Sequence, residues 1–391
     1  MRLLIPKTGL PAKRILKELN QRLGKDFTYD SGRIIGSMCT KPNRFAQSVY
    51  AKYLAKNLGD IGLFPNTARI EKETIQMLGS LLSCPGAVGN IVSGGTEANI
   101  LALWAFRNSV AQEGDKARKE VIIPKSAHFC FDKAADLLRL KLVKIPLNDK
   151  KSVSVNAVRK AINAKTLAII GICGTTELGV VDPIPELSEI ALKNNLYLHI
   201  DACFGGFVLP FLENNSLFFD FRLPGVSSIA IDPHKMGMAP IPAGAILFRD
   251  PELYKRIQAN VNYLAGGESP QTLLGTRPGA SAIAVWSVLK YIGIDGYKKI
   301  VKRCMELTQR LANAIDSMDK ISCVIKPTIN VIGIKSDFID IRDLASALRR
   351  KGWAVALFPN HIRIVIMPHT KPVHINWLVR DLKNILRKEL I

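Results

Sequence analysis

The stretch Ser228–Pro240, SIAIDPHKMGMAP, indicates how this chain folds. A strand-like apolar run ends at Asp232 and Pro233 and is followed at once by His234 and Lys235. Lysine is seldom buried, so the simplest interpretation of Lys235 is a solvated residue that ends the strand. The alternative is a lysine placed at the edge of a sheet for its chemistry, and the other motifs of the chain distinguish the two.

Similar short apolar runs lie on both sides of this stretch. Strands are expected at residues 120–124, 142–146, 167–173, 196–201, 228–232 and 244–248. Helical patterns over residues 127–140, 155–164 and 184–194 separate several of them. Strand-like runs that alternate with helices of about ten residues predict an α/β domain with a mostly parallel sheet.

A smaller set of elements follows a long helical region at residues 281–292 and 296–318. Strands are expected at ISCVI, INVIGI, WAVAL and IRIVIMP, with helices over residues 339–350 and 372–387. This pattern predicts a separate α+β lobe. We divide the chain into an N-terminal helical segment (residues 1–60), a large cofactor-binding domain (61–297) and a small C-terminal domain (298–391).

The composition is that of a globular protein. The 391 residues are 48% hydrophobic and 22% charged, which suffices for a large core and is too apolar for disorder. The first residues, MRLLIPKTGLPAKRIL, do not form the apolar stretch of a signal peptide, and no apolar run approaches the length of a membrane span. The seven cysteines are scattered without a zinc-type spacing. We therefore expect a cytoplasmic protein with free thiols and no metal site.

The formal charge of +21 is the unusual bulk property of the chain. A basic protein can bind nucleic acid or acidic membranes, but here the basic residues are spread over the whole chain and no nucleic-acid-binding motif is present. A solvated basic surface is therefore the favoured interpretation, and no nucleic-acid or membrane partner is expected. The positive field can also concentrate an anionic substrate.

Polar residues collect at the ends of the expected strands, where open α/β sheets bind ligands. These residues are His128, Thr175, Thr176, Asp201, His234 and Lys235. Each has an ordinary interpretation when it is taken alone, since an aspartate after a strand is commonly a turn residue and a histidine can lie at any interface. Their occurrence together on one sheet is the informative feature.

Residues 91–99, IVSGGTEAN, place two glycines and Thr96 at the start of an expected helix. This pattern is typical of a capped helix, but backbone amides at such a start also bind phosphate, and glycine lets the phosphate approach closely. A phosphate site, an imidazole, a carboxylate and a lysine on one sheet predict a phosphorylated pyridinium cofactor. Gly95 and Thr96 would hold its phosphate, His128 would stack on its ring, Asp201 would pair with the ring N–H, and Lys235 would form a Schiff base.

Partial burial at the strand end is expected to disfavour the ammonium form of Lys235. A lowered pKa would provide a usable amine near neutral pH. On this interpretation Lys235 is a functional residue and not a solvated strand end.

The chain resembles the group II pyridoxal-phosphate-dependent amino-acid decarboxylases, and within them the archaeal L-tyrosine/L-aspartate decarboxylases. The resemblance covers nearly the whole chain through the motifs GSMC, NLGDIGLFPNTARIE, NIVSGGTEAN, GTTELGVVDPI, HIDACFGGFVLPF, IDPHKMG, LLGTRPGA and IRIVIMPH. It implies the aspartate-aminotransferase type of fold, fold type I of pyridoxal-phosphate enzymes. It also implies a homodimer with sites at the subunit interface, to which the N-terminal segment contributes.

The resemblance also implies roles for individual residues. Gly95, Thr96, His128, Thr176, Asp201, His234 and Lys235 would bind the cofactor, and Lys235, Asp201, His128 and Tyr263 would be catalytic. Arg363 would receive the substrate α-carboxylate, for which a planar fork is suited, although a surface arginine on an edge strand is the alternative. Tyr263 would protonate the product. Cys203 departs from the alanine that the family usually has on the far face of the ring.

The implied reaction is α-decarboxylation of an L-amino acid. We expect L-aspartate to give β-alanine for coenzyme A biosynthesis, with L-tyrosine or L-glutamate as alternative substrates. Lys41 and Arg44 could meet a distal carboxylate, or they could be solvated loop charges. The chain also resembles carbon–carbon lyases that cleave phosphorylated sphingoid bases, and a nucleic-acid-binding protein with an enzyme fold is the alternative from another class.

Overall fold

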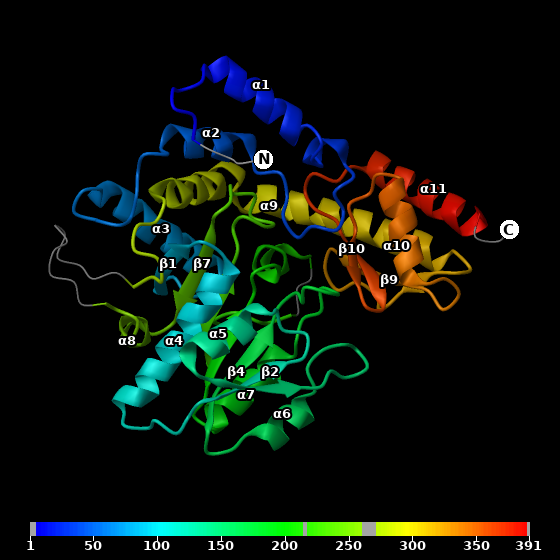
Figure 1. Ribbon diagram of the computed structural model, residues 1–391. Coiled ribbons are helices and arrows are strands. Elements are labelled where there is room, and N and C mark those ends of the chain that lie inside the picture. Colours follow the sequence, from blue (N-terminus) through cyan, green and yellow to red (C-terminus); the bar gives the residue numbers. More distant parts are fainter. Residues whose placement is uncertain (1–4, 214–216, 260–270, 389–391) are drawn as a thin grey trace.

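A computed structural model describes residues 5–213, 217–259 and 271–388 (Figure 1). Its larger sheet has seven strands in the order β1-β7-β6-β5-β4-β2-β3. The strands are β1 (Val88–Val92), β2 (Glu120–Pro124), β3 (Lys141–Ile145), β4 (Thr166–Ile172), β5 (Tyr197–Asp201), β6 (Val226–Ile231) and β7 (Gly244–Phe248). The strands β2 to β6 pair in parallel, whereas β7 is antiparallel to its neighbours β1 and β6. The expected mostly parallel α/β sheet is confirmed.

The strands β2, β4 and β7 are buried on both faces, and successive residues of a strand enter two different cores. In β7, Ala245 and Leu247 belong to the core that includes α7 and α9, whereas Ile246 and Phe248 belong to the core of α4 and α5. This burial on two faces explains why these strands are largely continuous apolar runs. The helices are α1 (Ala12–Leu23), α2 (Arg44–Lys52), α3 (Pro65–Leu81), α4 (Gly95–Gln112), α5 (Cys130–Leu138), α6 (Val155–Ala161), α7 (Ile184–Lys193), α8 (Pro251–Lys255), α9 (Gly279–Asp316), α10 (Ile341–Arg350) and α11 (Pro372–Lys388).

The strand β1 is not among the strands that the sequence predicts. Its residues VGNIV include Gly89 and Asn90, which have low strand propensity, and the helix start that follows them dominates the local pattern. The strand is held in the sheet by β7 and by a buried side chain of α3, since Glu71 accepts a hydrogen bond from the Ile91 amide at 2.9 Å.

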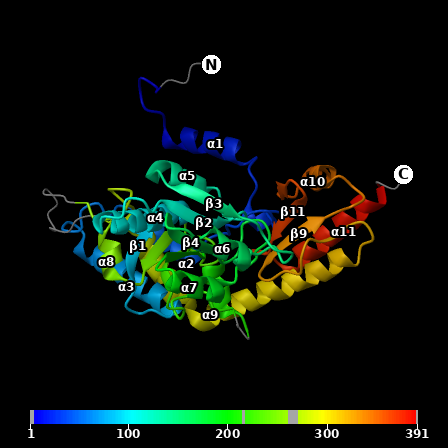
Figure 2. The ribbon, with the colours of Figure 1, turned by 90° about the horizontal axis from the view of Figure 1, so that it is seen from below.

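The smaller sheet is antiparallel and has the order β10-β11-β9-β8. Its strands are β8 (Ser322–Cys323), β9 (Val331–Lys335), β10 (Ala356–Phe358) and β11 (His361–Val365). Figure 2 shows α9 running from beneath the larger sheet to the side of α11. The helix has one non-helical residue, Gly293 with φ 64°, a value that favours glycine. The division of the chain at residues 60 and 297 stays a prediction.

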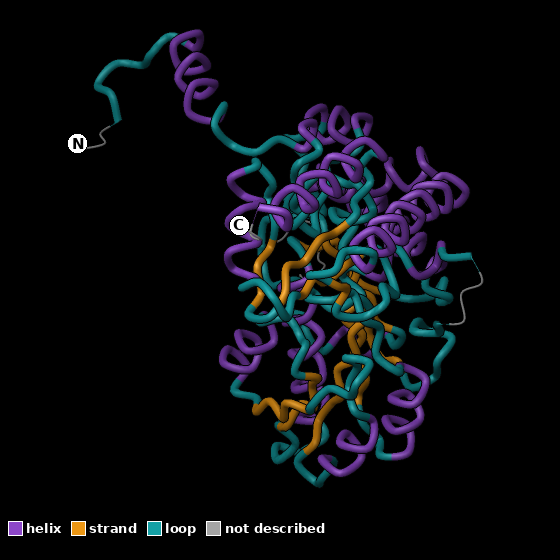
Figure 3. The backbone as a smooth tube through the Cα atoms, turned by 90° about the vertical axis from the view of Figure 1, so that its right-hand side faces the viewer, coloured by secondary structure: helices purple, strands orange, loops and turns teal. Residues whose placement is uncertain are grey.

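Helix α1 stands away from the rest of the chain (Figure 3). None of its residues is buried, and the apolar side chains Ile15, Leu16, Leu19 and Leu23 are 44% to 59% exposed. Among the described residues, no helix combines the length and the apolar character needed to cross a membrane.

Candidate active site

A cavity of about 370 Å³ lies at the carboxyl ends of β1, β2, β4, β5 and β6. The residues that the sequence predicts there come together, because the ends of parallel strands meet at one edge of the sheet. Gly95, Thr96, His128, Thr176, Asp201, His234 and Lys235 all line the cavity. Arg363 is not among the lining residues, and Tyr263 lies outside the described part of the chain.

The cavity wall next to β1 is the N-terminus of α4, which begins at Gly95 after Gly94. A Cβ atom on Gly95 would collide with Sγ of Cys203 and would lie 3.2 Å from Oδ2 of Asp232. Only glycine therefore fits here without displacing its neighbours. The Glu97 carboxylate accepts the Ser93 amide hydrogen at 2.8 Å, which fixes the turn into the helix.

The amine of Lys235 lies 2.9 Å from Oδ2 of Asp232, whose side chain is 2% exposed. The expectation that burial lowers the pKa of Lys235 is wrong. Burial does disfavour the ammonium, but the carboxylate of Asp232, helped by Cys203 and Asp201, outweighs it and raises the pKa. Lys235 is thus held as an ammonium in the cofactor-free protein, and Asp232 is a residue of the site that sequence reasoning missed.

We expect Asp232→Asn to lower the pKa of Lys235, because burial would then act without the carboxylate that opposes it. The measurement is the pH dependence of covalent capture of pyridoxal phosphate by the cofactor-free protein, trapped with borohydride and counted by mass spectrometry. The midpoint should fall by at least about one pH unit. Asp220→Asn, at an aspartate that is also 2% exposed but does not line the cavity, should leave the midpoint in place. An unchanged midpoint in Asp232→Asn would refute control of the lysine by Asp232.

The carboxylate of Asp201 is 8% exposed and is held on both oxygens. The Cys203 amide donates to Oδ1 at 3.1 Å, and the Asn99 side-chain amide donates to Oδ2 at 3.1 Å. Asn99 was not predicted from the sequence, although its position three residues after Thr96 places it on the same face of α4.

Two imidazoles in the cavity wall are kept neutral. Burial lowers the pKa of His128 and also that of His234. The Cys130 amide donates to Nδ1 of His128 at 3.3 Å, and the Ala243 amide donates to Nδ1 of His234 at 3.1 Å. In both rings Nδ1 therefore accepts and Nε2 carries the hydrogen.

Arg363 on β11 is 9% exposed and donates to two backbone carbonyls. Its Nη1 bonds to the Thr176 carbonyl at 2.7 Å and its Nη2 bonds to the Gly36 carbonyl at 2.6 Å. Among the described residues its buried Nε has no partner. The guanidinium thus joins β11 to the segments that bear Thr176 and Gly36, while its Nε–H makes no hydrogen bond among the described residues.

The segment after Gly36 contributes to the site, since Met38 lines the cavity. The amine of Lys41 contacts both carboxylate oxygens of Asp30, at 2.5 and 2.6 Å. Its charge is therefore already paired in the described structure.

The residues around the cavity fit pyridoxal phosphate. The start of α4 offers backbone amides and a glycine that leaves room for phosphate. Asp201 is a fixed acceptor for a pyridinium N–H, and Lys235 provides the amine. Among the described residues Oδ1 of Asp232 is buried without a partner, which leaves an acceptor next to that amine.

Comparisons with known proteins agree with this geometry. The model of a family described as "Pyridoxal-dependent decarboxylase conserved domain" matches residues 40–335. The L-aspartate decarboxylase of Thermococcus kodakarensis is 47% identical in an alignment of 389 positions, which covers 98% of this chain and 100% of that protein. A protein of Methanothermobacter thermautotrophicus, named as a probable L-tyrosine/L-aspartate decarboxylase, is 47% identical and covers 93% of this chain and 99% of its own length. The sphingosine-1-phosphate lyase of Burkholderia pseudomallei superposes with a TM-score of 0.91 at 29% identity, covering 99% of this chain and 93% of that one.

The fold and the lysine-bearing cavity thus define an enzyme of fold type I that uses pyridoxal 5′-phosphate. Within that class, the chain belongs to the pyridoxal-dependent decarboxylase family, as an amino-acid decarboxylase.

Proposed function

We propose that this enzyme decarboxylates L-aspartate to β-alanine and carbon dioxide. The observation that carries the proposal is the placement of Lys235, Asp201, His128 and the start of α4 around one cavity. The choice of L-aspartate is supported by the name of the Thermococcus kodakarensis relative. When bound, pyridoxal phosphate supplies the electron sink that takes up the electron pair left at Cα when carbon dioxide departs.

The residues of the cavity have distinct tasks in this proposal. Lys235 holds the cofactor covalently through Nζ, and Gly95 and Thr96 bind the phosphate with their backbone amides. Asp201 would accept the ring N–H, and its negative charge would keep the proton there, while the hydrogen bonds from Cys203 and Asn99 fix the orientation of the carboxylate. The neutral ring of His128 packs on the cofactor ring.

His234 and Thr176 complete the cofactor contacts in the proposal. Nε2 of His234 lies 3.6 Å from Oδ2 of Asp232, so His234 stands beside the carboxylate that faces the lysine. Thr176 would approach the substituents of the cofactor ring, and its backbone carbonyl accepts a hydrogen bond from Nη1 of Arg363.

Two further roles concern the substrate. The unpartnered Nε and the remaining N–H groups of Arg363 would receive the α-carboxylate. Tyr263 would donate the proton to Cα, and its position lies outside the described residues.

We further propose a cytoplasmic homodimer that produces β-alanine for coenzyme A biosynthesis. The exposed apolar side chains of α1 support an interface between two subunits, since such surfaces are commonly covered in oligomers.

The substrate test is a set of separate incubations with L-aspartate, L-glutamate, L-tyrosine and a phosphorylated sphingoid base. We expect β-alanine from L-aspartate, with a kcat/KM at least about 10-fold above that of any other substrate. Protein stripped of cofactor and then restored with pyridoxal phosphate is the control, and it should lose and regain this activity. Tyramine as the main product would favour the L-tyrosine alternative named for the Methanothermobacter relative. An aldehyde from the sphingoid base would favour the lyase that the Burkholderia structure represents.

A further inference from the structure

A line of buried polar side chains leads away from the cavity behind Asp201. It runs through Asn99 on α4 and His199 on β5 to Ser228 on β6. Asn99 is 1% exposed, and His199 and Ser228 are each 0% exposed. Polar groups buried this deeply cost free energy unless they are hydrogen-bonded, and each of these makes a hydrogen bond.

The donor and the acceptor of each hydrogen bond in this line are fixed, with every donor on the side away from Asp201. A carboxylate can only accept, so Asn99 turns its Nδ2 toward Oδ2 of Asp201, at 3.1 Å. Its Oδ1 then faces Nε2 of His199 at 2.8 Å, and this nitrogen has to carry the hydrogen. Nδ1 of His199 is left as an acceptor, 2.8 Å from Oγ of Ser228, whose hydroxyl therefore donates.

The surroundings of His199 maintain this direction. Burial lowers its pKa to about 4, so the ring is neutral near pH 7 and carries a single hydrogen. Reversing the Asn99 amide would bring its oxygen against Asp201 and its NH2 group against the Nε2–H. Asn99 is further held by Sγ of Cys130, which accepts from Nδ2 at 3.2 Å.

We propose that His199 and Ser228 are positioning residues, which fix the Asn99 amide and thereby hold the Asp201 carboxylate aimed into the cavity. The proposal rests on the proposed function only for the consequence that Asp201 meets the cofactor ring. The strands β5 and β6 bring these residues together. Asp201 and His199 are two residues apart on β5, so their side chains point to the same face of the sheet. Ser228 pairs directly with His199 across the β5–β6 ladder.

The first test needs no cofactor. The chain has six histidines, so nitrogen NMR of histidine-labelled, cofactor-free protein at pH 7.5 resolves few signals, and His199→Gln assigns the one of interest. We expect His199 to carry its hydrogen on Nε2. A hydrogen on Nδ1, or an imidazolium, would overturn the proposal.

The second test uses the loaded enzyme. His199→Phe removes both hydrogen bonds but places a ring beside Phe106 and Phe131, whose centroids lie 6.5 and 6.4 Å from that of His199. We expect kcat to fall by about 100-fold with little change in KM. Without the two hydrogen bonds of His199 the Asp201 carboxylate loses its alignment, and a misaligned catalytic group commonly lowers the rate by about this factor. The nitrogen NMR signal of labelled pyridoxal phosphate should shift toward that of an unprotonated ring.

Milder variants separate positioning from folding. Ser228→Ala should lower kcat and shift the same cofactor signal in the same direction, by less than His199→Phe. His199→Gln keeps a donor toward Asn99 and should recover most of the activity. Ser287→Ala, which removes a buried hydroxyl bonded to the Ile283 carbonyl in α9, is the matched control and should leave both measurements unchanged.

The outcomes also separate this proposal from the proposed function. Folded His199→Phe and Ser228→Ala proteins with unchanged kcat and an unchanged cofactor signal would refute the positioning role. A wild-type protein that fails to bind pyridoxal phosphate would refute the proposed function, and the tautomer of His199 would still decide whether the line of hydrogen bonds exists as described.

Discussion

Replacing Lys235 by alanine should remove decarboxylation almost completely, with a loss of kcat of at least about 1,000-fold. The amine is the group in the cavity that can bind a carbonyl covalently, and it sits within 2.9 Å of the buried Asp232. The variant should also lose the yellow absorbance of the lysine-bound cofactor. Absorbance spectra of the purified protein and product analysis with L-aspartate are the measurements.

A matched control for Lys235→Ala is Lys41→Ala. Lys41 is paired with Asp30 and does not line the cavity, so its removal should leave the yellow absorbance intact. A Lys235→Ala protein that stays yellow after dialysis and keeps its activity would refute the covalent role of Lys235.

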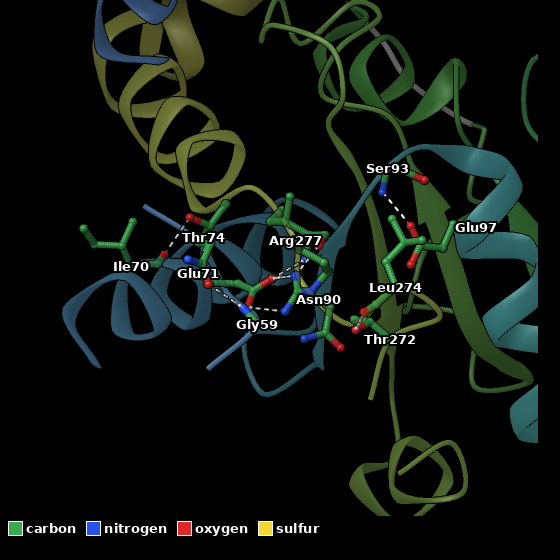
Figure 4. Close-up of polar contacts among 12 residues, drawn as sticks. Gly59, Ile70, Glu71, Thr74, Asn90, Ser93, Glu97, Thr272, Leu274 and Arg277 are labelled. Atoms are coloured by element: carbon green, nitrogen blue, oxygen red, sulfur yellow. Dashed lines mark hydrogen bonds and ion pairs between the residues drawn. The ribbon is translucent and has the colours of Figure 1, made fainter. Parts of the chain in front are cut away.

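The second large effect concerns stability. Glu71 on α3 and Arg277, just before α9, form a buried ion pair in which Nη1 lies 2.5 Å from Oε1 and Nη2 lies 3.1 Å from Oε2 (Figure 4). Glu71 also accepts the Ile91 amide, while Arg277 donates to the Ile91 carbonyl at 2.5 Å. The pair therefore fastens β1, which leads into the start of α4, to α3 and to the segment just before α9.

We expect Glu71→Ala to lower the free energy of unfolding by about 3 to 5 kcal/mol, because it leaves the guanidinium of Arg277 buried without its counter-charge. Denaturant unfolding followed by circular dichroism measures this loss. Glu213→Ala breaks the exposed pair with Lys302 and should leave the free energy nearly unchanged. The double variant Glu71→Leu with Arg277→Leu should recover much of the loss. If Glu71→Ala is as stable as the wild-type protein, the pair does not hold β1 in place.

Much of the fold could be predicted because the strands β2, β4 and β7 of the larger sheet are buried on both faces and are therefore largely apolar. The placement of Asp201, His128 and Lys235 at one edge followed from the shared direction of parallel strands. The strand β1 was missed because Gly89 and Asn90 weaken its pattern, so that its place depends on contacts with distant residues.

The protonation states and hydrogen-bond partners of the site residues were harder to predict than which residues form the site. Burial alone suggested a lowered pKa for Lys235, and the opposite direction arises because the turn of Asp232–Lys235 brings the carboxylate back to the amine. The partners of Arg363 are backbone carbonyls, for which side-chain identity gives no indication. The proposed role of Tyr263 stays a prediction.

The contact between Gly95 and Cys203 constrains the order in which this site can change during evolution. The two residues share one small volume, because a methyl group on residue 95 would occupy the space of the Cys203 sulfur. A side chain at position 95 therefore requires either a smaller residue at position 203 or a displacement of the Cys203 sulfur. If position 95 changes first, the sulfur of Cys203 has to move, so the thiol makes one order of substitutions less costly than the other.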